Sequence, residues 1–141
     1  MAVGQILNRE LFIFLLDLEV KRARRYQNFF CILTLKLAGL RDPTNGNGLH
    51  NCYQKLSHLL REELRESDIL GSLGHNLLAA LLPYADPSAS TNVRSRFEAN
   101  LRLYNFQQDG YSVMIDQIYF PKDGTVAADL ISKVTGIAEA G

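Results

Sequence analysis

Apolar residues recur along the chain with two different periods, and the changes of period predict alternating helices and strands. Segment 8–27 has the 3.6-residue spacing of an amphipathic helix, and Asn8 is suited to cap its start. The apolar stripe predicted for this helix is Leu7, Leu11, Phe14, Leu15 and Leu18. The short apolar run from Phe30 to Leu37 predicts a buried strand.

A second helical pattern ends near Ser67 and leads into a predicted β-hairpin. The apolar face of this helix is Cys52, Leu56, Leu59, Leu60 and Leu64. Two apolar runs, 68–73 and 76–83, follow it and are separated by the polar turn around Gly74, His75 and Asn76. Short apolar runs on either side of a glycine-containing turn are typical of paired antiparallel strands.

The last third of the chain predicts a helix, a strand and a closing helix. Asp86 suits the N-cap and Pro87 the first turn of a helix within 85–106, with Val93, Phe97 and Leu101 as its stripe. Segment 110–121 is rich in β-branched and aromatic residues and stops at Pro121, which predicts a strand. The stripe of a final helix over 122–134 is Val126, Leu130, Ile131 and Val134.

The predicted order of elements is α-β-α-β-β-α-β-α. Without the first helix this order is βαββαβ, the arrangement of ferredoxin-like folds. We therefore expect an α/β fold of the α+β sandwich type, with a ferredoxin-like core and an extra N-terminal helix. Residues 1–141 are expected to form a single domain, since the length suits one core.

Composition and charge argue against several functional classes. Fifteen basic and fifteen acidic residues give zero net charge, which disfavours a nucleic-acid partner. The two cysteines, Cys31 and Cys52, form no CxxC motif, and the three histidines have no metal-ligand spacing. No segment has the length of a membrane span or the pattern of a signal peptide. We expect a cytoplasmic domain with no membrane insertion.

Several short motifs occur in an order and spacing that resemble those of one family. They are "NR..F" at 8–12, "R..D" at 65–68, the turn at 74–78, "LLP" at 81–83 and "FP.DG" at 120–124. Together they resemble a GGDEF domain, the bacterial diguanylate cyclase module, over nearly the whole chain. The resemblance implies the GGDEF or nucleotide-cyclase-like fold.

The resemblance also implies a catalytic site whose chemistry this sequence lacks. In the family, two metals are held by an aspartate at the end of a strand and by the acidic third residue of the signature turn. These positions correspond here to Lys36 and Asn76, and neither is a carboxylate. The degenerate signature turn is Gly74, His75, Asn76, Leu77 and Leu78. We therefore expect no catalytic residue, no metal and no cofactor.

In many GGDEF domains the R..D motif binds the product, cyclic di-GMP, and a second arginine completes that site. The corresponding residues are Arg65 and Asp68, with Arg94 or Arg96 as the second arginine. An arginine fork and a carboxylate suit the hydrogen-bonding edge of guanine. The same spacing also describes an ordinary ion pair at a helix end, in a helix rich in glutamate.

Three functions remain open from the sequence. The first is a catalytically inactive GGDEF-like domain that acts as a regulatory or protein-interaction module in bacterial cyclic di-GMP signalling. Its partner would be a second copy in a homodimer or another signalling protein. The second is a cyclic di-GMP receptor that binds through the R..D motif, and the third is an enzyme with residual nucleotide chemistry.

Overall fold

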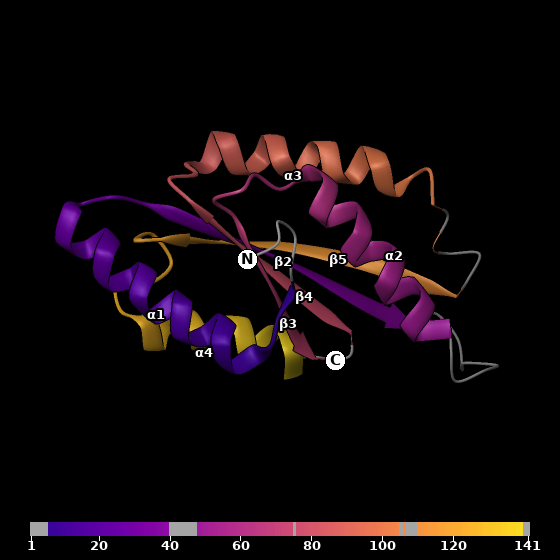
Figure 1. Cartoon of the computed structure of the whole chain (residues 1–141), viewed down its shortest axis with the longest axis horizontal. Helices are drawn as coiled ribbons and strands as arrows, with labels where there is room; N and C mark the ends of the chain where they lie inside the picture. The colour runs from indigo at the N-terminus through magenta and orange to yellow at the C-terminus, as the bar shows by residue number, and fades with distance from the viewer. Residues whose placement is uncertain (1–5, 40–47, 75, 105, 107–109, 140–141) are drawn as a thin grey trace.

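The computed structural model describes residues 6–39, 48–74, 76–104, 106 and 110–139. Within these residues the chain forms one five-stranded sheet covered by helices on both faces (Figure 1). The strands are β1 (Ile6–Leu7), β2 (Phe30–Gly39), β3 (Ile69–Gly74), β4 (Leu77–Pro83) and β5 (Tyr111–Phe120). The helices are α1 (Arg9–Tyr26), α2 (Gly48–Glu63), α3 (Pro87–Leu101) and α4 (Ala127–Glu139).

The sheet confirms the predicted ferredoxin-like core. Its strand order is β1-β3-β4-β2-β5, and each pair among the last four strands is antiparallel. Helix α2 connects β2 to β3, and α3 connects β4 to β5, which gives βαββαβ. Strand β1 was not predicted. It pairs in parallel with β3 through Ile6 and Leu7, and two residues are too few to show a period in the sequence.

The helices form two layers, with α1 and α4 on one face of the sheet and α2 and α3 on the other (Figure 1). Alternate side chains of β2 enter different layers. Leu33 and Leu35 belong to the core beneath α2 and α3, whereas Phe30 and Ile32 belong to the core beneath α1 and α4. A strand buried on both faces needs apolar residues at nearly every position, which explains its continuous apolar run.

The apolar stripe predicted for the first helix was wrong. The residues of α1 that are buried against the sheet are Phe12, Leu16, Val20 and Ala23. Three members of the predicted stripe, Leu11, Phe14 and Leu18, are instead exposed to solvent. Both sets have helical spacing, so the period alone could not decide which of them faces the core.

The motif "NR..F" has a structural explanation at the start of α1. The side-chain oxygen of Asn8 accepts a hydrogen bond from the Leu11 N–H at 2.8 Å, as expected for a helix cap. Arg9 donates to the carbonyl of Leu73 at 3.4 Å, and the ring of Phe12 lies over Gly71. All of these contacts position α1, and two of them bind it to β3.

The other three helices are confirmed, although their bounds differ from the prediction. Helix α2 ends at Glu63 rather than near Ser67, and α3 ends at Leu101. Helix α4 begins at Ala127, so Val126 of its predicted stripe lies outside the helix. The reason lies in a turn after β5, where the Asp123 carboxylate accepts a hydrogen bond from the Tyr119 N–H at 2.7 Å. None of the helices in the described part of the chain is long and apolar enough to cross a membrane.

The contact between Phe12 and Gly71 leads to a first prediction. A β-carbon added at Gly71 would lie 2.5 Å from Cδ2 of Phe12, so Gly71→Ala forces the ring or the helix to move. We expect the free energy of unfolding to fall by about 1–3 kcal/mol, the usual cost of overpacking a core. Urea denaturation measures this change.

Gly136→Ala is the matched control, because a β-carbon at that exposed position in α4 meets nothing within 4 Å. It should leave stability unchanged or raise it by about 1 kcal/mol, since alanine favours the helix over glycine. A Gly71→Ala variant as stable as the unmodified chain would contradict the packing described here.

Candidate functional site

The residues singled out in the sequence lie at opposite ends of β3. Arg65 and Asp68 precede this strand, and the turn that includes Asn76 follows it. Lys36 is paired with Leu77 across the sheet, next to the turn. The structure therefore brings Lys36 and Asn76 together and separates both from the arginine–aspartate pair.

Asn76 fastens the turn to the central strand. Its backbone carbonyl accepts a hydrogen bond from the Leu37 N–H at 2.8 Å. Its side-chain amide Nδ2 donates to the Leu37 carbonyl oxygen at 3.2 Å. One residue thus satisfies both backbone polar groups of Leu37 at the end of the sheet. His75, the neighbouring residue of the predicted turn, lies outside the described residues.

The next two positions of the degenerate turn are part of the cores. Leu77 and Leu78 are both 0% exposed. Leu77 packs beneath α1 and α4, and Leu78 packs beneath α2 and α3. Gly74, by contrast, is exposed, and a β-carbon there would meet only the Asn76 Oδ1 atom at 3.9 Å. The residues after the turn therefore contribute packing on both faces.

Lys36 and Asn76 do not fit a magnesium site. Mg²⁺ requires hard oxygen ligands in octahedral geometry, and carboxylates usually supply them. Lys36 instead places an ammonium group on a strand position that is only 5% exposed. Asn76 uses its amide N–H to hold Leu37. Among the described residues, no group of three or more His, Cys, Asp or Glu side chains is arranged to hold a metal.

A hydrogen-bonded chain near the turn was not anticipated from the sequence. The Tyr53 hydroxyl on α2 donates to the Ser72 hydroxyl at 2.5 Å, and Ser72 donates to the Gly74 carbonyl at 3.2 Å. Burial raises the pKa of Tyr53, and the bond to Ser72 partly offsets this rise. The chain ties α2 to the strand before the turn. No motif pointed to it, because Tyr53 and Ser72 belong to different elements.

Arg65 and Asp68 form a closed arrangement between the end of α2 and the start of β3. The Asp68 side chain is 2% exposed. Its Oδ2 accepts from the Arg65 backbone N–H at 2.8 Å, and its Oδ1 accepts from the Arg65 guanidinium at 3.1 Å. The same guanidinium donates to the Pro83 carbonyl at 3.0 Å. This pair therefore has a structural role, because it joins the end of α2 to the end of β4.

Arg94 belongs to a partly buried polar network between α3 and β5. Its guanidinium donates to Glu98 at 2.8 Å and to the Gln117 side chain at 3.2 Å. Gln117 donates to the Ser90 hydroxyl at 2.6 Å, and this hydroxyl lies 2.9 Å from the Cys31 sulfur. Burial raises the pKa of the Cys31 thiol to about 11, so the thiol stays protonated and unreactive near neutral pH.

Arg96 forms an ion pair at the end of α2, close in sequence to the arginine–aspartate pair. Its Nε lies 3.3 Å from a carboxylate oxygen of Glu63, the last residue of α2. Arg65 follows Glu63 by two positions. Of the two arginines predicted to complete a ligand site, only Arg96 is thus attached to this end of α2. Whether the site binds a ligand stays a prediction.

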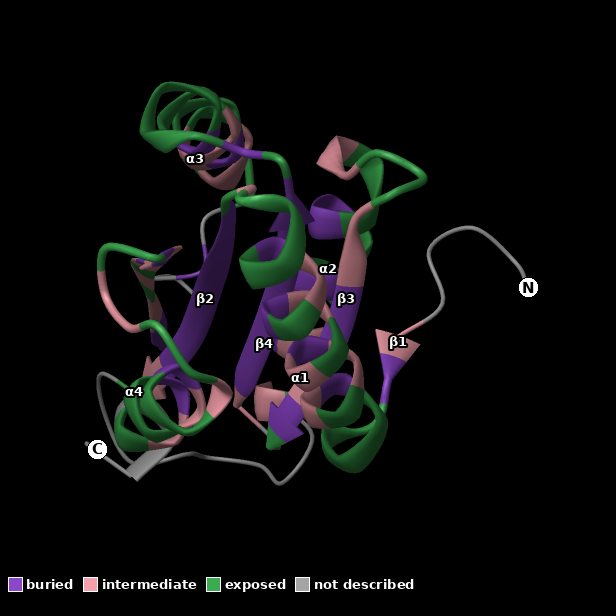
Figure 2. Cartoon of the chain, turned by 90° about the vertical axis from the view of Figure 1, so that its left-hand side faces the viewer, coloured by how far each residue is buried: buried purple, intermediate pink, exposed green. Residues whose placement is uncertain are grey.

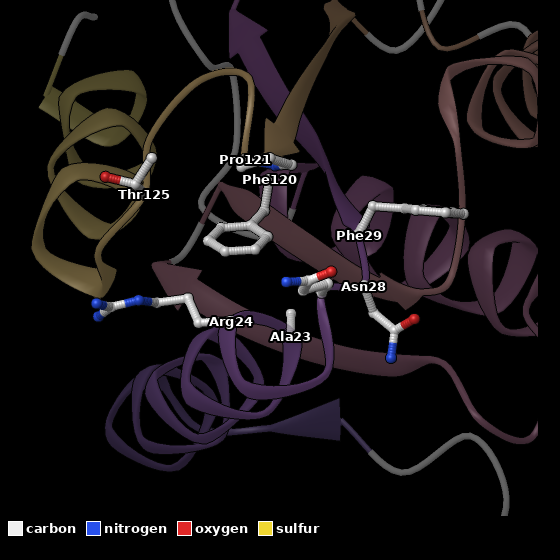
Figure 3. A pocket seen from close by; sticks show the side chains of 8 residues that line it. Ala23, Arg24, Asn28, Phe29, Phe120, Pro121 and Thr125 are labelled. Atoms are coloured by element: carbon white, nitrogen blue, oxygen red, sulfur yellow. The ribbon is translucent and has the colours of Figure 1, made fainter.

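A pocket of about 440 Å³ lies at the other end of the sheet from the turn. Its lining residues come from the end of α1, the segment between α1 and β2, the end of β5 and the segment after it: Ala23, Arg24, Gln27, Asn28, Phe29, Phe120, Pro121 and Thr125. The ring of Phe120 is central in the view, with Arg24 and Thr125 on one side (Figure 3). No pattern in the sequence indicated this pocket, because no single motif contains its residues.

Comparisons with known proteins assign the fold. No family model and no curated protein matches the chain. The GGDEF domain of FimX from Pseudomonas aeruginosa has a TM-score of 0.80 and 20% identity, with 99% of this chain and 91% of that chain covered. A DGC protein from Thermotoga maritima also has a TM-score of 0.80, with 16% identity and coverage of 95% and 96%.

A third solved structure is the GGDEF domain of DgcB from Caulobacter crescentus in complex with c-di-GMP. It has a TM-score of 0.68 and 12% identity, with 99% of this chain and 85% of that chain covered. These similarities establish an α+β sandwich and, more specifically, the fold of GGDEF domains. The fold that the sequence motifs implied is therefore confirmed.

The double attachment of Asn76 to Leu37 leads to a second prediction. Asn76→Asp replaces the donating amide by an acceptor that faces a carbonyl oxygen. We expect the free energy of unfolding to fall by about 1–2 kcal/mol, because one hydrogen bond is lost and two oxygens repel each other. Thermal or urea unfolding near neutral pH measures the loss. Asn92→Asp on the exposed surface of α3 is the matched control and should change stability little. Equal effects of the two substitutions would contradict a structural role for the Asn76 amide.

Proposed function

We propose that this chain is a GGDEF-like domain without diguanylate cyclase activity that serves as a regulatory or protein-interaction module in bacterial cyclic di-GMP signalling. The shared fold supports the link to this signalling system. The changes at the signature turn support the loss of catalysis. Its partner is either a second copy of the chain or another signalling protein.

The observation that carries the proposal is the hydrogen bond that the Asn76 side chain donates to Leu37. At the position where a cyclase would hold a metal with a carboxylate, this chain has an amide that binds the neighbouring strand. The other such position, Lys36, supplies a cation within the sheet. Joining two molecules of GTP requires neutralisation of phosphate charge and an activated hydroxyl, which metal ions usually provide. These two positions offer neither a carboxylate nor a set of oxygen ligands.

The proposal predicts the outcome of a turnover assay. The chain incubated with GTP and either Mg²⁺ or Mn²⁺ should form no cyclic di-GMP above the level without protein. An active GGDEF domain assayed in parallel shows that the conditions support turnover. Formation of cyclic di-GMP by the unmodified chain, lost on denaturation, would overturn the proposal and favour the enzyme with residual nucleotide chemistry.

A second candidate function is that of a cyclic di-GMP receptor. Two observations favour it: the Arg65 side chain is 59% exposed, and Arg96 is attached to the same helix end through Glu63. A solved neighbour with the same fold is a complex with c-di-GMP. We rank this function second, because both Asp68 oxygens already accept hydrogen bonds from Arg65.

The receptor function predicts a specific pattern in calorimetry. Cyclic di-GMP should bind the unmodified chain, and Arg65→Ala or Arg96→Ala should abolish the heat. Arg25→Ala is the matched control, because Arg25 is an exposed residue of α1 on the other face of the sheet. Absence of heat with the unmodified chain, or equal binding by Arg65→Ala, would eliminate the receptor while leaving the first function intact.

A further inference from the structure

Helix α1 has a second apolar face that points away from the sheet. Leu11, Phe14 and Leu18 are 42%, 58% and 46% exposed, and Leu15 beside them is half-buried. The spacing i, i+3, i+4, i+7 places these four residues on one face of the helix. They lie opposite the residues that pack on the sheet, and α1 is an outer layer of the molecule (Figure 2). We call these four residues the outer stripe.

Scattered exposed apolar residues are common, but an aligned set on one helix is a feature of interaction surfaces. The stripe lies in the first half of the 18-residue helix, between Glu10 and the basic residues that end it. An apolar centre with charged residues at its rim is the usual anatomy of a protein interface. The outer stripe and the charged residues beside it thus have the composition of a protein interface.

The charges of α1 indicate which partner fits the stripe. The segment 9–19 has three acidic residues and one basic residue, a net charge of −2. The segment 20–26 has four basic residues and no acidic residue, a net charge of +4. Asp17 and Glu19 form ion pairs with Lys21 and Arg22 of the same helix, which leaves Glu10 as the acidic residue available to a partner. Two copies of this helix packed antiparallel about the outer stripe would place Glu10 of each copy beside the basic segment of the other. A parallel pair would instead place like charges together.

We propose that two copies of this chain associate through antiparallel packing of their α1 helices, with the outer stripe at the centre. A two-fold axis requires a self-complementary surface, and the apolar stripe with Glu10 at one end and Arg25 at the other provides one. With Phe14 of each copy opposite Leu18 of the other, Glu10 lies beside the basic segment of the second copy, within one helical turn of its Arg25. Glu10 and Arg25 make no ion pair with any residue that the structure describes, so both are available.

The dimer is weak and depends on concentration. The outer stripe spans only about 12 Å of helix, at about 1.5 Å per residue over roughly eight residues. A stable protein interface buries about 800 Å² on each partner, more than one short stripe provides. In this dimer a second copy of the chain is the partner of the proposed interaction module, so the dimer rests on that proposed function. It does not depend on the loss of catalysis.

Sedimentation velocity of the whole chain, from low to high micromolar concentration, tests the surface. The unmodified chain should shift from monomer to dimer as its concentration rises. Phe14→Glu and Leu18→Glu should each weaken the dimer by about tenfold or more, because a charge enters the apolar centre. Leu103→Glu is the matched control, since Leu103 is 80% exposed and lies beyond the end of α3. Circular dichroism confirms that each variant is folded.

A charge exchange tests the antiparallel arrangement separately. Glu10→Lys alone and Arg25→Glu alone should each weaken self-association, since each creates like charges across the two-fold axis. An equimolar mixture of the two variants should restore dimers. In the mixed dimer the lysine introduced at position 10 of one copy faces the glutamate introduced at position 25 of the other, and the unmodified Arg25 faces the unmodified Glu10. A structural effect of either substitution would not be reversed by mixing.

Three outcomes would overturn the proposed dimer: a monomer at every concentration, an undiminished dimer in Phe14→Glu and Leu18→Glu, or a mixture that does not associate. Any of these three outcomes leaves the proposed loss of cyclase activity untouched, because that loss is tested by GTP turnover. Formation of cyclic di-GMP by a chain that dimerises through α1 would overturn the function and leave the surface in place.

Discussion

Burial of β2 and β4 on both faces is the constraint on which the rest of this structure depends. Strand β2 pairs with β4 on one side and with β5 on the other, and two helical layers cover it. Its backbone polar groups have no access to water, so neighbouring strands must satisfy them. The turn after β3 meets this requirement at the end of the sheet, because Asn76 bonds to both backbone groups of Leu37.

The same constraint determines what the candidate site can do. Around the signature turn, Asn76 and Leu77 hold the strand ends together, and Lys36 occupies a buried strand position. At the far end of β3, Arg65 and Asp68 close the end of α2 and bind Pro83. At both ends, side chains that could bind ligands are used for internal contacts. The proposed interaction module needs this framework but requires no open catalytic site.

Helix α1 has a different role from the other helices. One of its faces completes the core through Phe12, which lies against the backbone of Gly71. Its opposite face presents Leu11, Phe14 and Leu18 to solvent, with acidic and basic residues separated along the helix. The fold therefore places an apolar surface at an outer layer of the molecule. Association through this surface would leave the sheet and its two cores unchanged.

The sequence by itself determined the types and order of nearly all elements, the ferredoxin-like core and the likeness to GGDEF domains. These properties follow from local periodicity, helix caps such as Asn8 and Asp86, and the spacing of short motifs. Only the tertiary structure decided which face of α1 is buried, because both stripes have the same period and the packing of Phe12 over Gly71 joins distant segments. It also decided the roles of Asn76, Asp68 and Arg94, whose hydrogen-bond partners lie on other elements. Contacts between distant segments leave no local pattern, so no reading of spacing alone could assign them.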